Sequence, residues 1–406
     1  TQFDDVVWFD SNNHNGKYSQ YDAILAVDAF TAIQTDYIDA FEKFKEYQTI
    51  TNDWLFGYLT YDLKNDVEAL HSNNYDGLEF PDLYFFQPKK LFLIKDNTVE
   101  LQYLKMVDDE FEKDLETIET YNLKSETSKN EVKIKLRIHK DEYFNKVNTV
   151  LNHIHRGDIY EANFCQEFYA EQTTINPLET YKKLNRISKP PFATFLKLGD
   201  KYLLSASPER YIKKVDRKIT SQPIKGTAKR SANKEEDANL KRNLALDEKE
   251  RSENIMIVDL VRNDLSLTAT KGSVKVEELC KVYTFDQVHQ MISTVVSVIK
   301  EETHPIDVIK TTFPMGSMTG APKISAMKII ESLEETKRGL YSGAVGYITP
   351  KGDFDFNVVI RSILYNASKQ YVSYSVGGAI TVKSDPLKEY EECLVKAKAM
   401  RQVLED

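Results

Sequence analysis

Cysteine is scarce in this sequence, and its few copies are widely spaced. The 406 residues include 3 cysteines, at positions 165, 280 and 393. No Cys-x-x-Cys pair occurs, so neither a disulfide framework nor a cysteine zinc site is predicted. The 7 histidines show no zinc-ligand spacing either. The sequence therefore points away from disulfide-stapled and zinc-binding proteins.

Positive charge and long apolar runs are also in short supply. Lys and Arg number 54 against 63 Asp and Glu, which gives a net charge of -9. Nucleic-acid binding needs clustered Lys and Arg for the phosphates, so this balance argues against a nucleic-acid partner. No apolar run approaches the about 18 residues of a membrane helix, and the acidic opening TQFDDVVWFD is unlike a signal peptide. We therefore expect a cytoplasmic protein with no membrane partner.

A polar segment divides the chain into two predicted parts. Residues 122–131, NLKSETSKNE, are almost free of large apolar side chains and are the predicted linker. They separate an N-terminal region, 1–121, from a larger domain, 132–406. Strand-like runs (54–63, 159–170) mix with helical ones (140–155, 247–262) without regular βαβ alternation. This mixture predicts an α+β fold with a largely antiparallel sheet core covered by helices.

Glycine is concentrated in one part of the chain. Of 15 glycines, eight lie between positions 316 and 378. Because glycine lets the backbone approach a ligand closely, we expect a pocket in this region. Within it, GSMTGAPK (316–323) joins a turn to a helix start, where free N–H groups can bind an anion. A capped helix after a tight turn explains the same residues.

The C-terminal segment predicts a helix with a charged face. Asp385 is a good N-cap and Pro386 a good first-turn residue. Glu389, Glu392 and Lys396 fall close together on this helix and away from a predicted apolar stripe. They form either a solvated face with a weak ion pair or carboxylates offered to a hard cation, with a lysine for an anion. The predicted stripe comprises Leu387, Tyr390, Leu394, Ala397 and Leu404.

Three further segments carry candidate residues. Glu253 precedes the apolar run IMIVDLV, and a single Glu at this place is typical of the first turn of a helix. Lys225 in PIKGT (223–227) is either a surface-loop lysine or a desolvated amine that acts as a nucleophile. Glu209 in SASPERY (205–211) is either a turn carboxylate or a general acid. The residues alone leave these alternatives open.

The order and spacing of these segments resemble the chorismate-utilising enzyme family, which includes anthranilate, aminodeoxychorismate, isochorismate and salicylate synthases. The resemblance runs from about residue 139 to 397, and the N-terminal part resembles the family mainly through WLFGYLTYDL (54–63). The matching segments are GDIYEANFCQEF (157–168), SASPERY, PIKGT, ENIMIVDLVRND (253–264), GSMTGAPK, YSGAVG (341–346), VVIRS (358–362), VGGAI (376–380) and SDPLKEYEECLVKA (384–397).

The resemblance implies roles for individual residues. Glu253 and Glu392 resemble Mg²⁺ ligands, with Glu389 a neighbouring carboxylate, and the metal would hold the ring carboxylate of chorismate. Glu209 resembles the general acid that protonates the departing 4-hydroxyl. The implied substrate-binding residues are Ser317, Tyr341, Arg361, Gly378 and Lys396. Of these, Tyr341 and Arg361 would bind the enolpyruvyl carboxylate.

Lys225 decides which branch of the family the sequence resembles. PIKGT is similar to the aminodeoxychorismate synthase branch, whereas the anthranilate branch reads PIAGT. In the implied reaction, Lys225 attacks C2 of chorismate while the 4-hydroxyl leaves, and ammonia then attacks C4 and expels the lysine. The product is 4-amino-4-deoxychorismate, on the route to 4-aminobenzoate and folate. Because an amine attacks only when neutral, we expect the pKa of Lys225 to be lowered.

Two positions depart from the family pattern. Glu161 stands where water-using members have Lys and ammonia-using members usually have Gln, and the missing Lys argues against water as nucleophile. Gln290 stands where members often have His, with His289 one residue earlier. Anthranilate synthase component I and, less closely, isochorismate synthase remain alternatives, as does a catalytically inactive chorismate-binding subunit. Mg²⁺-dependent turnover of chorismate separates the active classes from the inactive one.

The nitrogen source follows from the cysteine contexts. A class I glutaminase needs a nucleophilic Cys in a Gly-flanked elbow, and NFCQE, ELCKV and EECLV have no flanking Gly. The sequence also ends at residue 406, directly after the matching domain. We therefore expect a separate glutamine amidotransferase subunit to supply ammonia, and a second enzyme to eliminate pyruvate from the product.

Overall fold

The computed structural model describes the chain except for residues 1, 15–16, 122–131, 287 and 406, so the predicted linker lies outside the described residues. The strands are β1 (Asp5–Asp10), β2 (Ala23–Thr35), β3 (Leu55–Leu59), β4 (Leu83–Lys95), β5 (Thr98–Tyr103), β6 (Lys135–Leu136), β7 (Glu161–Ala170), β8 (Phe192–Leu198), β9 (Lys201–Ser207), β10 (Arg210–Val215), β11 (Lys218–Gln222), β12 (Ile224–Lys229), β13 (Lys275–Thr284), β14 (Val288–Val298), β15 (Gly320–Ala321), β16 (Ala344–Ile348), β17 (Phe354–Val358), β18 (Ser362–Asn366) and β19 (Tyr371–Thr381).

The helices and short 3₁₀ turns lie between and after these strands. They are α1 (Ala40–Thr51), η1 (Tyr61–Leu63), α2 (Lys64–Val67), η2 (Lys105–Glu110), α3 (Phe111–Thr120), α4 (Lys140–Arg156), α5 (Pro177–Ser188), α6 (Lys234–Leu246), α7 (Glu248–Ser266), α8 (Pro305–Thr312), η3 (Gly316–Met318), α9 (Lys323–Leu333) and α10 (Pro386–Glu405). Among the described residues, none of these helices is both long and apolar enough to cross a membrane.

The sheet is antiparallel throughout the described ladders. Strand β1 pairs with β2 and with β8, and β3 pairs with β4 and with β16. Backbone hydrogen bonds therefore join strands from both sides of segment 122–131. The predicted α+β fold with an antiparallel core covered by helices is confirmed. The division into regions 1–121 and 132–406 stays a prediction.

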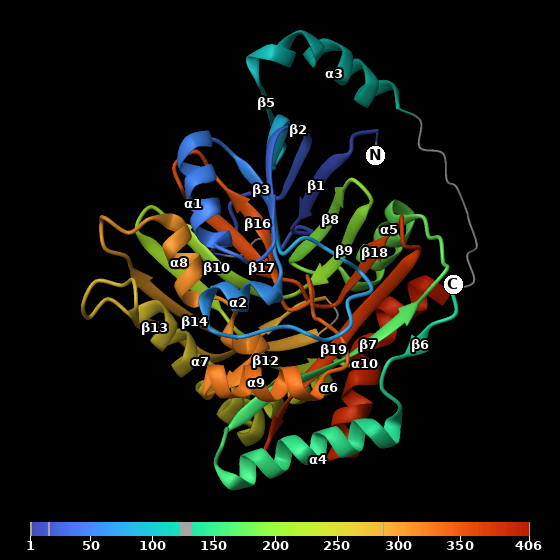
Figure 1. Ribbon diagram of the computed structural model, residues 1–406, viewed down its shortest axis with the longest axis vertical. Coiled ribbons are helices and arrows are strands. Elements are labelled where there is room, and N and C mark those ends of the chain that lie inside the picture. The colour runs from blue at the N-terminus through green and yellow to red at the C-terminus, as the bar shows by residue number, and fades with distance from the viewer. Residues whose placement is uncertain (1, 15–16, 122–131, 287, 406) are drawn as a thin grey trace.

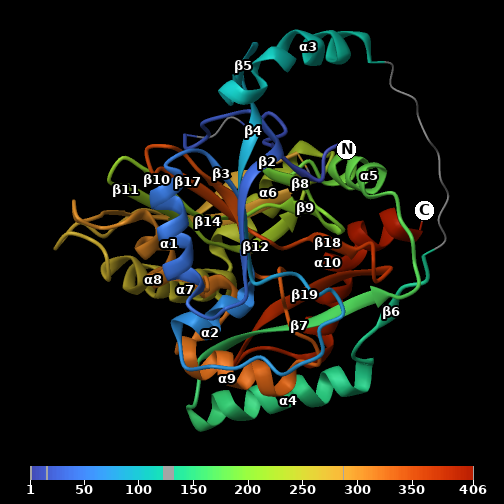
Figure 2. The same ribbon diagram turned by 45° about the horizontal axis from the view of Figure 1, so that its top comes forward.

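Helices cover the sheet network on opposite sides (Figure 1). Helix α10 packs against β19, α4 and α5, around a buried cluster that includes Tyr143, Phe164 and Tyr374. Helices α1, α7 and α8 pack near one another over a second cluster that includes Phe44 and Ile257. Helix α3 extends away from the body of the molecule in both views and buries none of its side chains (Figure 2).

The predicted helical runs 140–155 and 247–262 are helices α4 and α7. Helix α4 ends at Gly157, whose φ of 84° is the left-handed cap conformation that glycine accepts readily. Helix α7 begins after Asp247, whose side chain accepts a hydrogen bond from the Glu250 backbone. The predicted strand in 54–63 is β3.

The inward face of α10 differs from the predicted apolar stripe. Leu387 and Leu394 are 43% and 38% exposed. The residues that the helix buries are Glu389, Cys393, Ala397, Met400, Val403 and Leu404. A charged residue can face inward here because β19 carries Gly378 opposite it. A Cβ at Gly378 would lie 3.2 Å from Oε2 of Glu389. The predicted stripe is therefore wrong at Leu387 and Leu394, whereas Ala397 and Leu404 are buried as predicted.

Candidate active site

Lys225 lies at an irregularity in the β12–β14 ladder. The pairing jumps from Ile224 to Thr227, so two residues of β12 face one of β14. Gly226 takes a φ of 84°, and a Cβ there would lie 3.0 Å from Oε2 of Glu250. The Lys225 side chain is only 11% exposed, and its Nζ donates to Oε1 of Glu161 at 3.0 Å. The surface-loop interpretation of Lys225 is therefore wrong.

The charges around Lys225 overturn the expected pKa. Burial lowers the pKa of the Lys225 ammonium, but the carboxylates of Glu161, Glu253 and Glu209 raise it by more, so the pKa of Lys225 lies above its ordinary value. The expected lowering is wrong for this state of the protein, because the sequence did not reveal that three acidic groups from separate elements surround the amine.

Glu209 is a buried carboxylate between β9 and β10. Its backbone carbonyl accepts a hydrogen bond from the Val358 N–H, and the residue is 4% exposed. Burial raises the pKa of Glu209 to about 7, opposed by the Ser317 hydroxyl and by the charges of Lys225 and Arg361. A carboxyl group that is half protonated near neutral pH suits a general acid.

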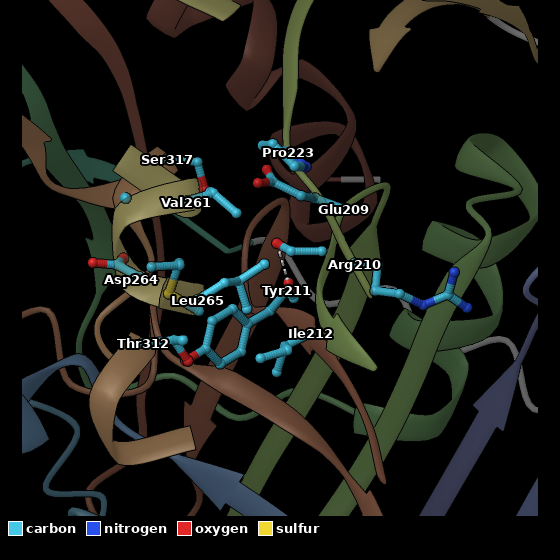
Figure 3. A pocket seen from close by; sticks show the side chains of 13 residues that line it. Glu209, Arg210, Tyr211, Ile212, Pro223, Val261, Asp264, Leu265, Thr312 and Ser317 are labelled. Carbon is cyan, nitrogen blue, oxygen red and sulfur yellow. Dashed lines mark hydrogen bonds between the residues drawn. The ribbon is translucent and has the colours of Figure 1, made fainter. Parts of the chain in front are cut away.

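A small pocket opens beside Glu209. Figure 3 shows Glu209 and Ser317 at its upper edge, with Tyr211 and Thr312 below. Ser317 lies in η3, and its backbone carbonyl accepts a hydrogen bond from Nδ2 of Asn163 at 2.8 Å. Of the predicted site residues, all of which the structure describes, Glu209 and Ser317 alone line this pocket. It is therefore one side of the site and not the whole of it.

The predicted metal carboxylates converge from α7 and α10. Nζ of Lys249 lies 3.8 Å from Oε1 of Glu253 and 3.4 Å from Oε1 of Glu389. A Cβ at Gly378 would lie 3.2 Å from Glu389 and 3.6 Å from Oε1 of Glu392. The structure therefore places three carboxylates in one region. Two of them, Glu253 and Glu392, are 139 positions apart in the sequence.

Lys396 lies beside this carboxylate group. Its Nζ pairs with Oε1 of Glu392 at 2.7 Å and donates to the Gly377 carbonyl at 2.7 Å. Burial raises the pKa of Glu392, but the charge and the hydrogen bond of Lys396 lower it by more, so the pKa of Glu392 lies below its ordinary value. Glu392 is therefore ionised at neutral pH.

The acidic group fits a hard cation in its chemistry. Oε1 of Glu253 is buried and accepts no hydrogen bond in the described part of the chain, and burial, opposed by Lys225 and Lys249, raises the pKa of Glu253 to about 7. No three His, Cys, Asp or Glu side chains among the described residues meet closely enough to hold one ion. Mg²⁺ uses one or two carboxylates plus substrate oxygens, so the donors present suffice. In this structure the ammonium group of Lys249 lies between the carboxylates of Glu253 and Glu389.

Arg361 and Tyr341 have different surroundings. Arg361 lies between β17 and β18 with a φ of 50°, and no hydrogen bond or ion pair of its guanidinium occurs within the described ranges. Burial lowers the pKa of Arg361, and the charge of Glu209 opposes this. The Tyr341 hydroxyl instead contacts Sγ of Cys165 at 3.5 Å. Arg361 is therefore available to an anion beside Glu209, whereas Tyr341 is engaged elsewhere.

Sequence reasoning missed Lys249 and did not connect Glu161 with Lys225. Lys249 precedes Glu253 by one helical turn, so helical spacing was a signal that could have found it. At the altered family position, Nε2 of Gln290 is buried and has no hydrogen-bond partner among the described residues. Nε2 of His289 lies 3.0 Å from Oδ1 of Asp237, so that histidine is held by α6.

The chain is similar to enzymes that use chorismate. It is 43% identical over 275 residues to an aminodeoxychorismate synthase of Streptomyces griseus, covering 67% of this chain and 37% of that protein. It is 38% identical over 266 residues to aminodeoxychorismate synthase component 1 of Escherichia coli, covering 66% of this chain and 58% of that protein. The chain thus spans less than two thirds of the length of both relatives.

The fold is similar to that of a solved structure over nearly its whole length. Anthranilate synthase component I of Streptococcus pneumoniae superposes with a TM-score of 0.83 at 26% identity, covering 96% of this chain and 94% of that one. A family model described as chorismate binding enzyme matches residues 4–402. The antiparallel fold, the buried acidic site and this match over almost the entire sequence agree, and the chain belongs to the family of chorismate binding enzymes.

Proposed function

We propose that this chain converts chorismate and ammonia to 4-amino-4-deoxychorismate, as component I of an aminodeoxychorismate synthase. The observation that carries the proposal is the buried Lys225, an amine at a position where a nucleophile can act away from water. The relatives from Streptomyces griseus and Escherichia coli, whose names state this activity, support the same reading. The similarity to anthranilate synthase component I makes that enzyme the second candidate.

In the proposed first step, the Lys225 amine forms a bond to C2 of chorismate. Both ring double bonds shift, from C1=C2 to C1=C6 and from C5=C6 to C4=C5, and the bond between C4 and its hydroxyl oxygen breaks. Glu209 gives its proton to that oxygen, which leaves as water; the raised pKa of about 7 supplies the protonated form. In the second step ammonia bonds to C4, both double bonds shift back, and the bond from C2 to Nζ breaks. One ammonia thereby replaces one hydroxyl group.

The remaining site residues bind and orient the substrate. Glu253 and Glu392, with Glu389 beside them, would hold Mg²⁺, which neutralises the charge of a substrate carboxylate. Arg361, which has no partner in the described part of the chain, suits the second carboxylate. Ser317 lies beside Glu209 in the pocket, where its hydroxyl can orient the departing group.

Releasing ammonia from glutamine requires a reactive cysteine thiolate, and none of the three cysteines provides one. Cys165, Cys280 and Cys393 are all buried. Burial raises the pKa of Cys165 to about 12, and it also raises the pKa values of Cys280 and Cys393, so none is the low-pKa thiolate that glutamine hydrolysis requires. A separate glutamine amidotransferase subunit is therefore the proposed ammonia source.

The test supplies the pure chain with chorismate, Mg²⁺ and either glutamine or an ammonium salt at alkaline pH, and identifies the product by mass spectrometry. We expect 4-amino-4-deoxychorismate from ammonium and none from glutamine. Anthranilate as the main product would favour the second candidate. Efficient use of glutamine would contradict the hypothesis of a separate amidotransferase subunit. The absence of any turnover would contradict the proposal that the chain is an enzyme.

A further inference from the structure

Glu161 is the charged partner of the proposed nucleophile, yet the reaction described above gives it no task. It is the first residue of β7, where it pairs with Thr381 of β19 and Ala321 of β15, and it is 1% exposed. Its Oε1 accepts the hydrogen bond from Nζ of Lys225 at 3.0 Å. Its Oε2 is buried and has no hydrogen-bond partner among the described residues.

The first step needs a proton acceptor at Lys225. In the resting protein the lysine is held as a cation by its acidic neighbours, and a cation has no lone pair with which to attack C2. Burial keeps bulk water away from Nζ. Glu209 and Glu253 act on Lys225 through their charges, but neither is hydrogen-bonded to it within the described ranges. Glu161 is the carboxylate that lies within proton-transfer distance.

The geometry of Glu161 allows such a transfer. Its Oε1 already accepts the hydrogen bond from Nζ of Lys225 at 3.0 Å, so the proton can cross without moving either side chain. The transfer turns a buried ion pair into two neutral groups, and the lone pair of Lys225 is then free to attack C2.

We propose that Glu161 is the catalytic base that takes the proton of Lys225 before attack and returns it after the lysine is expelled. This rests on the proposed function, because it requires Lys225 to be the nucleophile. Glu161 takes one proton from the ammonium group, and the freed lone pair forms the bond to C2. When the bond between C2 and Nζ breaks, Lys225 leaves as the free amine and recovers its proton from Glu161. Glu209 recovers its own proton from solvent.

The decisive variant is Glu161→Gln, which preserves the size of the side chain and an oxygen that accepts from Lys225. The variant cannot take up the proton. The readout is the Lys225–substrate adduct, which forms with chorismate in the absence of ammonia and has the mass of protein plus chorismate minus water. We expect adduct formation to slow by at least about 100-fold, the usual contribution of a general base. Chorismate affinity, measured by titration calorimetry, should change little.

A purely electrostatic role of Glu161 gives the opposite result. If Glu161 only stabilised the lysine cation, Glu161→Gln would release the free amine, and the adduct would form at least as fast as in the wild type. That outcome overturns the proposal. Glu167→Gln is the matched control, because Glu167 is also buried in β7 but pairs with Arg137 and Tyr371. It should form the adduct at the wild-type rate.

Chemical rescue gives an independent measurement. Glu161→Ala leaves a cavity beside Lys225, and added formate should restore adduct formation there without accelerating the wild type. Thermal unfolding shows whether each variant is folded. If the wild type itself forms no adduct, the lysine route of the proposed function fails. If the wild type forms it and formate rescues nothing, the role of Glu161 alone is refuted.

Discussion

Two buried groups at the centre of the site, Lys225 and Glu209, respond differently to burial. Burial by itself would neutralise Lys225, but the surrounding carboxylates keep it charged. Burial does dominate at Glu209 and brings its pKa to about 7. The environment therefore prepares an acid and holds the nucleophile in reserve until its proton is removed.

Removing the amine tests the covalent route. Lys225→Ala should abolish adduct formation and reduce 4-amino-4-deoxychorismate formation by at least about 100-fold. Ammonia can still attack C2 directly, so some anthranilate-type product is expected. Chromatography of the products measures both. Lys218→Ala is the control, because Lys218 is an exposed lysine on neighbouring β11 that pairs with Glu277. Wild-type amination by Lys225→Ala would refute the mechanism.

The pKa of Glu209 predicts a pH dependence. A general acid works only in its protonated form, and that fraction falls as the pH rises through about 7. The rate of adduct formation should therefore fall between about pH 6 and about pH 8. Ammonia is absent from this measurement, so its own ionisation cannot distort the curve. Glu209→Gln should be slow at every pH, and a wild-type rate that rose with pH would exclude Glu209 as the acid.

At the scale of elements, α7 and α10 carry carboxylates that meet at Lys249. Glu253→Gln and Glu392→Gln should each weaken Mg²⁺ binding by at least about 10-fold and leave turnover very low, because Mg²⁺ depends on few carboxylates. Calorimetry and the Mg²⁺-dependent rise in unfolding temperature measure the binding without turnover. Glu391→Gln, on the exposed face of α10, is the control. Wild-type metal titrations of both site variants would rule the ligands out.

Two adjacent glycines of β19 face different surroundings. A Cβ at Gly377 would lie 2.4 Å from Sγ of Cys165, inside the core, so Gly377→Ala should lower the unfolding temperature. A Cβ at Gly378 would meet the flexible ends of Glu389, Glu392 and Lys396 at 3.2–3.8 Å. Gly378→Ala should therefore keep its stability but bind chorismate more weakly. The reverse pattern, measured by thermal unfolding and calorimetry, would contradict this placement of the site.

At the scale of the whole molecule, the sheet joins the two ends of the chain. Strand β8 pairs with β1, and β16 pairs with β3. A fragment of residues 132–406 would lose these partners and expose unpaired strand edges. We expect it to aggregate when expressed alone and to become soluble when residues 1–121 are co-expressed. Size-exclusion chromatography measures this, and a monomeric, cooperatively unfolding fragment would show that the two regions fold independently.

Much of the fold and part of the site could be predicted because their signals are local. The helical runs 140–155 and 247–262 are α4 and α7, and the mixture of short strands and helices indicates an antiparallel α+β fold. These features depend on backbone conformation and hydrogen bonds within a few residues. The order of the motifs was also sufficient to indicate the family, although it could not show which side chains touch.

The tertiary structure alone decided which groups share a buried environment. It turned Glu389 inward opposite Gly378, and it placed Lys249 between carboxylates of two helices. It also surrounded Lys225 with acidic groups from β7, α7 and the β9–β10 connection, which reversed the expected direction of its pKa. The physical reason is that burial and charge act through space. Residues far apart in the sequence therefore set the proton affinity of a side chain, and no local pattern records their distance.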